Sequence, residues 1–254
     1  MPTHPEVVVH PDAPVLAAAT AARLLTRLVD LQSHRSPLHV VLTGGTVGIA
    51  TLREIAASPA RDAVDWSGVH LWWGDERFLP DGDRDRNETQ VREALLDALG
   101  DALPAANVHP FPALDVAVPD GETSAAAYAA DLAAHAPEGA ATPAFDVLLV
   151  GMGPDGHVAS LFPGKATLDV QDVTVVAEHD SPKPPPERVS LTYPAIGAAR
   201  EVWVVAAGAE KAPAVARALA GDAVTTTPAA GARGTERTLW LVDVAAVQEV
   251  TPGD

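Results

Sequence analysis

The stretch LHVVLTGGT, residues 38–46, holds the local pattern that decides the fold. Its first five residues are mostly aliphatic or β-branched and predict a buried strand. The threonines and glycines of residues 43–46 end that strand, and residues 48–57 have the apolar spacing of a helix. A buried strand, a glycine-rich turn and a helix are the repeating parts of an α/β fold.

The same alternation continues on both sides of this stretch. Apolar spacing predicts further helices over residues 15–31, 87–99, 122–135 and 210–219. Apolar runs predict further strands over residues 69–73, 145–150, 173–177, 188–192, 202–206 and 238–242. We therefore expect an α/β fold with a mostly parallel sheet flanked by helices on both faces. No segment is long enough to be a domain linker, so we expect one domain over residues 1–254.

The composition restricts the partners. The 254 residues include 17 basic and 34 acidic side chains, a formal net charge of −17. Such a chain repels polyanions, so we expect neither a nucleic acid nor a membrane as partner. The chain has no cysteine, which excludes disulfides, thiolate nucleophiles and cysteine-bound zinc. With no membrane-spanning run and no signal-peptide pattern, we expect a cytoplasmic protein.

Lysine is rare in this chain. The three lysines lie in glycine- or proline-rich loops or just after them, at Lys165, Lys183 and Lys211. An acidic protein that binds a phosphorylated substrate needs a local concentration of positive charge. The three lysines are therefore candidate anion ligands.

Gly44, Gly45 and Thr46 stand between the first predicted strand and its helix. Glycines at a helix N-terminus allow backbone N–H groups to approach an anion. The alternative is an ordinary turn in which Thr46 caps the helix, and the short motif taken alone favours that alternative. The segment lacks the lysine of a P-loop and the spacing of a dinucleotide-binding loop.

Three charged residues, Asp75, Glu76 and Arg77, follow the predicted strand 69–73. Charges gathered at the end of a buried strand must pair with one another or bind a ligand. The planar guanidinium group of Arg77 suits a phosphate or carboxylate. An ion pair between Asp75 and Arg77 explains the pattern equally well, so both interpretations stay open.

The segment VGMGPDGHVASLFPG, residues 150–164, presents Asp155 and His157 in a rigid turn after a predicted strand. A histidine at a helix start is kept neutral by the helix dipole, and a neutral imidazole can accept a proton near pH 7. Of the nine histidines, His157 is the one that a glycine-rich turn holds beside a carboxylate. We expect His157 to be a general base, with Asp155 and Asp75 as the next candidates.

Two further cationic positions follow in the chain. The prolines of SPKPPPER, residues 181–188, stiffen the approach to a strand and fix where Lys183 and Arg188 point. Lys211 is expected in the first turn of the helix 210–219, where a cation opposes the helix dipole. Its position there indicates a nearby anion.

Two kinds of chemistry find no support in the motifs. The chain has no HExxH or HxxxH spacing and no local cluster of histidines and carboxylates, so we expect no metal site. It has no GxSxG motif, so we expect no serine nucleophile.

Taken in order, these segments resemble the 6-phosphogluconolactonase family. The specific motifs are GMGPDGHVASLFPG at residues 151–164 and the PKPPxR pattern that begins at residue 182. The GG(S/T) loop, W-x-DER with a later Asn87, GxEKA and the terminal WLVD also agree, and the likeness spans residues 38–246. Val47 stands where the family often has proline, and Arg86 stands where it usually has serine.

The resemblance implies hydrolysis of 6-phospho-D-glucono-1,5-lactone to 6-phosphogluconate, the second step of the oxidative pentose phosphate pathway, without a cofactor. It also implies a Rossmann-like fold shared with glucosamine-6-phosphate isomerases. It leaves open a weak association with the dehydrogenase that makes the lactone. We expect Arg77 and Lys211 to clamp the substrate phosphate, with the backbone of residues 44–46 as a third contact and Lys183 or Arg188 on the lid side.

Two alternatives stay open: an amino-sugar phosphate isomerase or deaminase on the same fold, and a non-catalytic sugar-phosphate sensor. The first family follows its GHxx segment with an acidic FNEP-like stretch, where this chain has ASLFP at residues 159–163. A sensor needs cationic side chains but no base, whereas this chain keeps Asp155 and His157 together. Both observations favour the lactonase.

Overall fold

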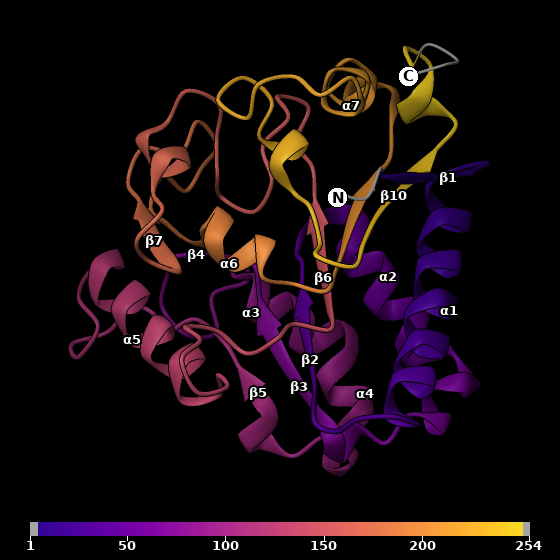
Figure 1. Cartoon of the computed structure of the whole chain (residues 1–254). Helices are drawn as coiled ribbons and strands as arrows, with labels where there is room; N and C mark the ends of the chain where they lie inside the picture. Colours follow the sequence, from indigo (N-terminus) through magenta and orange to yellow (C-terminus); the bar gives the residue numbers. More distant parts are fainter. Residues whose placement is uncertain (1–4, 251–254) are drawn as a thin grey trace.

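A seven-stranded parallel sheet forms the centre of the molecule (Figure 1). The computed structural model describes residues 5–250. Across the sheet the strands follow the order β1 (Glu6–His10), β10 (Arg237–Asp243), β9 (Glu201–Ala206), β6 (Val147–Gly151), β2 (Leu38–Leu42), β3 (Val69–Trp73) and β5 (Val108–His109). The neighbouring strands in this order all pair in parallel, so the predicted mostly parallel sheet is confirmed.

A second, antiparallel sheet of three strands packs beside the first. Its order is β4 (Asp75–Arg77), β8 (Arg188–Leu191) and β7 (Val175–Glu178). The strands predicted over residues 173–177 and 188–192 therefore do not belong to the parallel sheet, and the expected loop after Trp73 contains a strand. Sequence patterns miss β4 because all three of its residues are charged, which is not typical of a strand.

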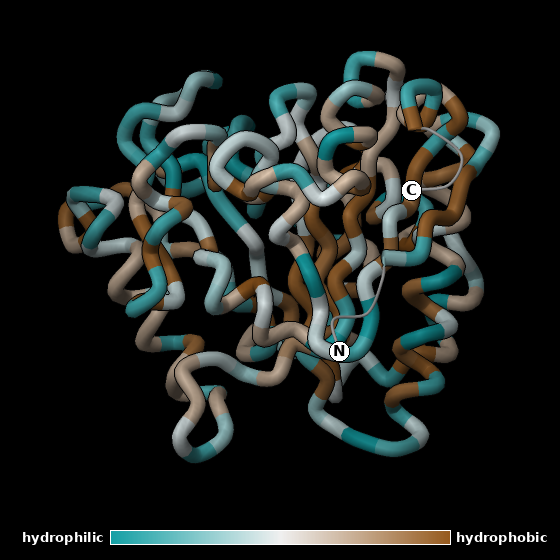
Figure 2. The backbone as a smooth tube through the Cα atoms, turned by 45° about the horizontal axis from the view of Figure 1, so that its top comes forward, coloured by the Kyte–Doolittle hydropathy of each residue, from teal (hydrophilic) through white to brown (hydrophobic). Residues whose placement is uncertain are grey.

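Helices cover both faces of the parallel sheet, as predicted. In Figure 1, α1 (Ala13–Gln32) and α2 (Gly45–Ala57) lie on one side, and α5 (Gly121–Ala134) lies on the other, against the second sheet. The shorter helices are α3 (Asn87–Val91) and α4 (Asp97–Leu99), which a π-helical turn joins, α6 (Tyr193–Gly197) and α7 (Ala212–Leu219). Figure 2 shows the hydrophobic central strands between more hydrophilic outer segments. Within residues 5–250, no helix has both the length and the apolarity to cross a membrane.

The start of α2 differs from the prediction. Gly44 is its N-cap, and the helix begins at Gly45, whose φ of +78° favours glycine. Thr46 is the second helical residue and not the cap. The sequence patterns also miss β1, β5 and α6, because these elements have only five, two and five residues and show no clear periodicity.

The chain reverses its direction across the sheet between β2 and β6. From β2 it adds β3 and β5 toward one edge, whereas from β6 it adds β9 and β10 toward the other edge. In open α/β sheets, ligands bind outside the carboxyl ends of the strands at such a reversal. The loops that follow β2 and β6 therefore mark the expected binding site.

Four histidine rings gather around Trp72 on the α5 side of the sheet. The indole Nε1–H of Trp72 donates to Nδ1 of His39 at 3.1 Å, and the indole stacks on His109 with ring centroids 3.9 Å apart. His70 and His135 complete the group. Burial, followed by the charges of the three other histidines, lowers the pKa of His39 to about 4.

We expect acid to destabilise the fold through His39. The pKa of an unfolded histidine is about 6.5, so between that value and about 4 the unfolded state binds the additional proton. The free energy of unfolding therefore decreases as the pH falls through this window, by about 3 kcal/mol at most from this residue. Urea unfolding at a series of pH values measures the slope.

The matched variants are His39→Gln and His34→Gln. His34 is exposed in the loop after α1 and should leave the pH slope of stability unchanged. His39→Gln should reduce the slope below pH 6.5. An equal slope in His39→Gln and the wild type would show that His39 is not the group responsible.

Candidate active site

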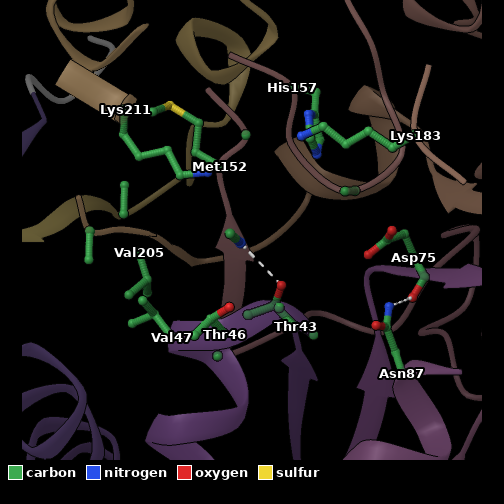
Figure 3. Close-up of a pocket in the computed structure, with 18 of the residues that line it drawn as sticks. Thr43, Thr46, Val47, Asp75, Asn87, Met152, His157, Lys183, Val205 and Lys211 are labelled. Atoms are coloured by element: carbon green, nitrogen blue, oxygen red, sulfur yellow. Dashed lines mark hydrogen bonds between the residues drawn. The ribbon is translucent and has the colours of Figure 1, made fainter. Parts of the chain in front are cut away.

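A pocket of about 470 Å³ lies at the carboxyl edge of the parallel sheet, where the chain reverses (Figure 3). Its volume is typical of sites for small molecules. Its walls come from the loops after β2, β6 and β9 and from β4, β8 and the loop before β8. Of the ten residues that the sequence singled out as site residues, nine line it: Gly44, Gly45, Thr46, Asp75, Arg77, His157, Lys183, Arg188 and Lys211. Asp155, the tenth, contacts His157 outside the lining.

His157 is held by Asp155. Nδ1 of the imidazole lies 2.6 Å from Oδ1 of Asp155, and the ring packs against Phe162 with ring centroids 4.6 Å apart. Because an ionised carboxylate can only accept, Nδ1 carries the proton, and Nε2 of a neutral ring keeps a free lone pair. The pocket wall thus contains an imidazole that can accept a proton.

Glycines shape the turn that presents His157. A Cβ at Gly153 would overlap the imidazole ring and the Asp155 carboxylate, so only glycine fits there. Gly156 has a φ of +89°. The expectation that a helix starts at His157 is wrong, because residues 157–164 form turns with isolated bridges. A carboxylate, rather than a helix dipole, sets the tautomer of His157.

Asp155 is ionised. Burial opposes its charge, but the hydrogen bond and charge of His157, together with nearby Lys183, outweigh burial and lower the pKa of Asp155 to about 2. Nζ of Lys183 lies 3.9 Å from the same carboxylate oxygen. An ionised carboxylate at Nδ1 stabilises the imidazolium that forms when Nε2 takes a proton.

Asp75 faces the pocket from β4 and belongs to a hydroxyl network. Its carboxylate accepts the hydroxyl of Ser160 at 2.7 Å, and the backbone N–H of Ser160 donates to the hydroxyl of Ser190 at 3.1 Å. The ion pair between Asp75 and Arg77 that the sequence suggested is not formed among the described residues. The Arg77 guanidinium instead donates to the carbonyl of Asp85 at 2.6 Å.

Asn87 and Gly44 fit each other at the pocket wall. Nδ2 of Asn87 donates to the backbone carbonyl of Asp75 at 2.8 Å (Figure 3). A Cβ at Gly44 would overlap the other end of this amide, so glycine is required for close packing. Oδ1 of Asn87 is buried with no donor within the described residues. The close fit to Gly44 therefore leaves one buried amide oxygen at the pocket wall without a hydrogen bond.

Four cationic side chains reach the pocket in two pairs. Arg77 and Arg188 are cross-strand partners in the second sheet, and Lys183 and Lys211 approach from the loops before β8 and after β9. Burial and then the charge of Lys183 lower the pKa of Lys211. Like charges held close together at a partly buried site favour a bound anion, because an anion relieves their repulsion.

Arg188 also orders the proline loop. Nε of its guanidinium donates to the carbonyl of Pro185 at 2.9 Å, and Nη2 donates to those of Lys183 and Pro184. These bonds occupy much of the guanidinium group. Arg188 therefore fixes the loop from which Lys183 extends.

Lys165 and Arg86 lie outside the lining of the pocket. Lys165 pairs with Asp180 at 2.9 Å and is not part of the lining, so its assignment as a candidate anion ligand is wrong. Arg86 is buried, and its guanidinium donates to the carbonyls of Leu79 and Phe111. Arg86 stands where a serine hydroxyl was expected, and its side chain instead holds the backbone at Leu79 and Phe111 in place.

Several lining residues are not among those predicted from the sequence. The hydroxyl of Thr43 accepts the backbone N–H of Gly151 at 3.1 Å, which joins the loop after β2 to the end of β6 (Figure 3). Ser160 and Asn87 lie within the quoted motifs, so a closer reading of the polar positions in these motifs would have found them. Asp243, which accepts the N–H of Gly208, lies within the quoted WLVD motif at the end of a strand.

Comparison with known proteins finds both similar sequences and similar structures. A 6-phosphogluconolactonase of Streptomyces coelicolor is 55% identical over 249 residues, which cover 97% of this chain and 95% of that protein. A solved structure of 6-phosphogluconolactonase from Trypanosoma brucei has a TM-score of 0.85 and 30% identity, covering 97% of this chain and 99% of the other. A monomeric glucosamine-6-phosphate deaminase has a TM-score of 0.76 at 15% identity, with coverage of 95% and 98%, a likeness of fold alone.

The family model described as glucosamine-6-phosphate isomerases/6-phosphogluconolactonase matches residues 11–240, which is most of the chain. The Rossmann-like fold that the sequence implied is the fold of these structural neighbours. The chain belongs to the glucosamine-6-phosphate isomerase/6-phosphogluconolactonase family.

Proposed function

We propose that the protein hydrolyses 6-phospho-D-glucono-1,5-lactone to 6-phosphogluconate. The observation that carries this proposal is the His157–Asp155 pair in a pocket that also holds four cationic side chains. The pair supplies a base for water attack, and the cations suit a phosphate on the same substrate. The relative at 55% identity carries the name of this activity.

A lactone is an activated ester, so its hydrolysis needs few protein groups. Nε2 of His157 takes a proton from water as the water oxygen attacks the carbonyl carbon, and the carbonyl oxygen becomes an oxyanion. The ring C–O bond then breaks, and the proton on His157 returns to the leaving oxygen. Asp155 acts as a positioning residue that stabilises the imidazolium between these steps.

The phosphate at the far end of the substrate orients the ring. We assign the main contacts to Arg77 and Lys211, with backbone N–H groups of residues 44–46 as a third contact. Lys183 is the better candidate for the lid side, because the Arg188 guanidinium is largely engaged by backbone carbonyls. Binding energy from the remote phosphate is then used to hold the lactone over His157.

The remaining parts of the proposal concern the whole protein. We propose one domain over residues 1–254, of which residues 1–4 and 251–254 lie outside the described part. Within residues 5–250 the two sheets are joined at Gly74, whose N–H donates to Leu42 and whose carbonyl accepts from Leu191. The substrate is a small phosphorylated sugar lactone, and a cytoplasmic location suits a charged metabolite that does not cross membranes. The isomerase alternative is disfavoured because residues 159–163 supply no acid.

We expect His157→Asn to lower kcat by about 10²- to 10⁴-fold, because general-base catalysis typically contributes that much. Affinity for 6-phosphogluconate should change little. Lactone turnover, corrected for spontaneous ring opening, and calorimetric product binding measure the two effects. Near-normal turnover in this variant would move the base to another residue, with Asp75 as the first to test.

Asp155→Asn tests the positioning role. An asparagine can donate its amide N–H to Nδ1 and so favour the tautomer with the proton on Nε2, which cannot accept another. We expect kcat to fall by at least about 10²-fold with KM nearly unchanged. Asp180→Asn, which removes an exposed carboxylate elsewhere, is the control and should keep wild-type activity. Equal activity in both variants would contradict the assignment.

Arg77→Ala tests the phosphate clamp. A hydrogen bond to a charged group contributes about 1.5–3 kcal/mol, so kcat/KM for the phosphorylated lactone should fall by about 10- to 100-fold. The rate on unphosphorylated gluconolactone should change much less. The exposed Arg53 provides the matched control for loss of one positive charge. Similar losses on the two substrates would place Arg77 at the reacting end or in the scaffold.

A further inference from the structure

A second group of titratable side chains lies away from the pocket, on the α5 side of the parallel sheet. His70 is in β3, His109 ends β5, and His135 follows α5. One ring nitrogen from each of these histidines lies within 4.8 Å of the other two. None of the three lines the pocket, so lactone hydrolysis makes no use of them. They are distant in sequence, which is why motif spacing gave no metal site.

The hydrogen bonds of His109 fix its tautomer. Nδ1 of His109 lies 3.0 Å from Oδ2 of Asp131, so Nδ1 donates to the carboxylate and Nε2 keeps its lone pair. This Nε2 lies 2.9 Å from Nδ1 of His70. The two nitrogens face each other and share a single proton, so a metal ion that replaced this proton would find two donors already aligned.

The surroundings keep these rings neutral. Burial first, and then repulsion from the neighbouring histidines, lowers the pKa of His70 and of His109, although Asp131 opposes the shift. Neutral imidazole is the form that binds metals, so the ion displaces only the proton between His70 and His109, which moves to the other nitrogen of the His70 ring. His39 is not a donor, because its Nδ1 accepts the indole N–H of Trp72.

The geometry requires only small movements. Ligand nitrogens around a tetrahedral zinc ion are about 3.3 Å apart, given bonds of about 2.0–2.1 Å. The pair of His70 and His109 would open by a few tenths of an ångström. His135 has a side chain that is 30% exposed and lies just beyond the end of α5. Its Nδ1 lies 2.9 Å from the backbone carbonyl of Asp131, which leaves Nε2 as the nitrogen for the ion. The same exposed side gives an ion its entry path from solvent.

Asp131 provides the outer support that metal-bound histidines require. It accepts from His109, and Nδ1 of His135 lies 3.2 Å from its other carboxylate oxygen. A carboxylate on the non-ligating ring nitrogen orients the ring and raises the basicity of the ligating nitrogen. The group thus combines three imidazoles with a carboxylate, a set that suits borderline dications such as zinc, nickel and copper.

We propose that His70, His109 and His135 form a binding site for a transition-metal dication of the zinc class, with Asp131 as the orienting carboxylate. Solvent completes the coordination. The ion connects β3 to the two-residue edge strand β5 and to the end of α5, so it stabilises this edge of the sheet. The site is independent of the proposed lactonase activity.

Zinc titration of the full chain, after treatment with a chelator, tests the proposal. We expect one equivalent of Zn²⁺ to bind with a Kd of about 10 μM or tighter, weaker than closed four-ligand sites. The melting temperature should rise with zinc concentration, as linkage requires. Because the Trp72 indole stacks on His109, Cu²⁺ at the same site should quench tryptophan fluorescence with the same stoichiometry.

The variants separate this site from the pocket. His135→Gln should weaken zinc binding at least about tenfold, as loss of one ligand or its support typically does. His34→Gln and His157→Asn should bind zinc like the wild type. If His135→Gln does not fold, Co²⁺ absorption of the wild type provides the second test, since tetrahedral imidazole coordination gives visible bands.

Two results would overturn the proposal. One is a Kd weaker than about 1 mM for the wild type, which would show that the histidines are packing residues only. The other is loss of binding in His157→Asn while His135→Gln keeps it, which would place the ion in the pocket.

Discussion

The site depends on the hydrogen bond that the Gly151 N–H donates to the Thr43 hydroxyl. It joins the loop after β2 to the last residue of β6, and from these two neighbouring strands the chain continues toward opposite edges of the sheet. The loops must therefore separate beyond this bond, and the space between them becomes the pocket. Gly48, near the start of α2, must be glycine because a Cβ there would overlap the Thr43 carbonyl. The site follows from the order of the strands before any catalytic residue is considered.

The second sheet supplies Asp75, Arg77 and Arg188 to the pocket. Because side chains alternate along a strand, β4 directs Asp75 and Arg77 to one face and Glu76 to the other. Glu76 is buried, and its carboxylate accepts the backbone N–H groups of Arg77, Asn87 and Glu88 while it lies 3.8 Å from the Arg86 guanidinium. This carboxylate thus fixes the strand that carries Arg77 to the helix that carries Asn87. Burial raises the pKa of Glu76 to about 7, although Arg86 and these hydrogen bonds favour its charged form.

The sequence is informative where local chemistry and position agree. The strand Leu38–Leu42 is predicted to the residue because it is continuously apolar, and the loops that follow strands are placed correctly because parallel strands share one carboxyl edge. The sequence is uninformative for β4, because charged residues have a low propensity for strands. These residues form a strand only because they pair with β8 in the second sheet. The sequence also suggested a helix start at His157, whereas the structure places the residue in a turn beside the Asp155 carboxylate. The gathering of His70, His109 and His135 depends wholly on tertiary contacts.

The same pair of groups, a carboxylate on the Nδ1 side of an imidazole, occurs twice in this fold with different consequences. Asp155 holds His157 and Asp131 holds His109, so both rings have the proton on Nδ1 and a lone pair on Nε2. What differs is the surroundings of the ring. His157 lines an open pocket with lysines nearby, where water and a carbonyl group can enter. The Nε2 of His109 instead faces a second imidazole at 2.9 Å, and its buried ring stacks on the Trp72 indole. The first arrangement suits proton transfer, and the second suits an ion that two nitrogens can share.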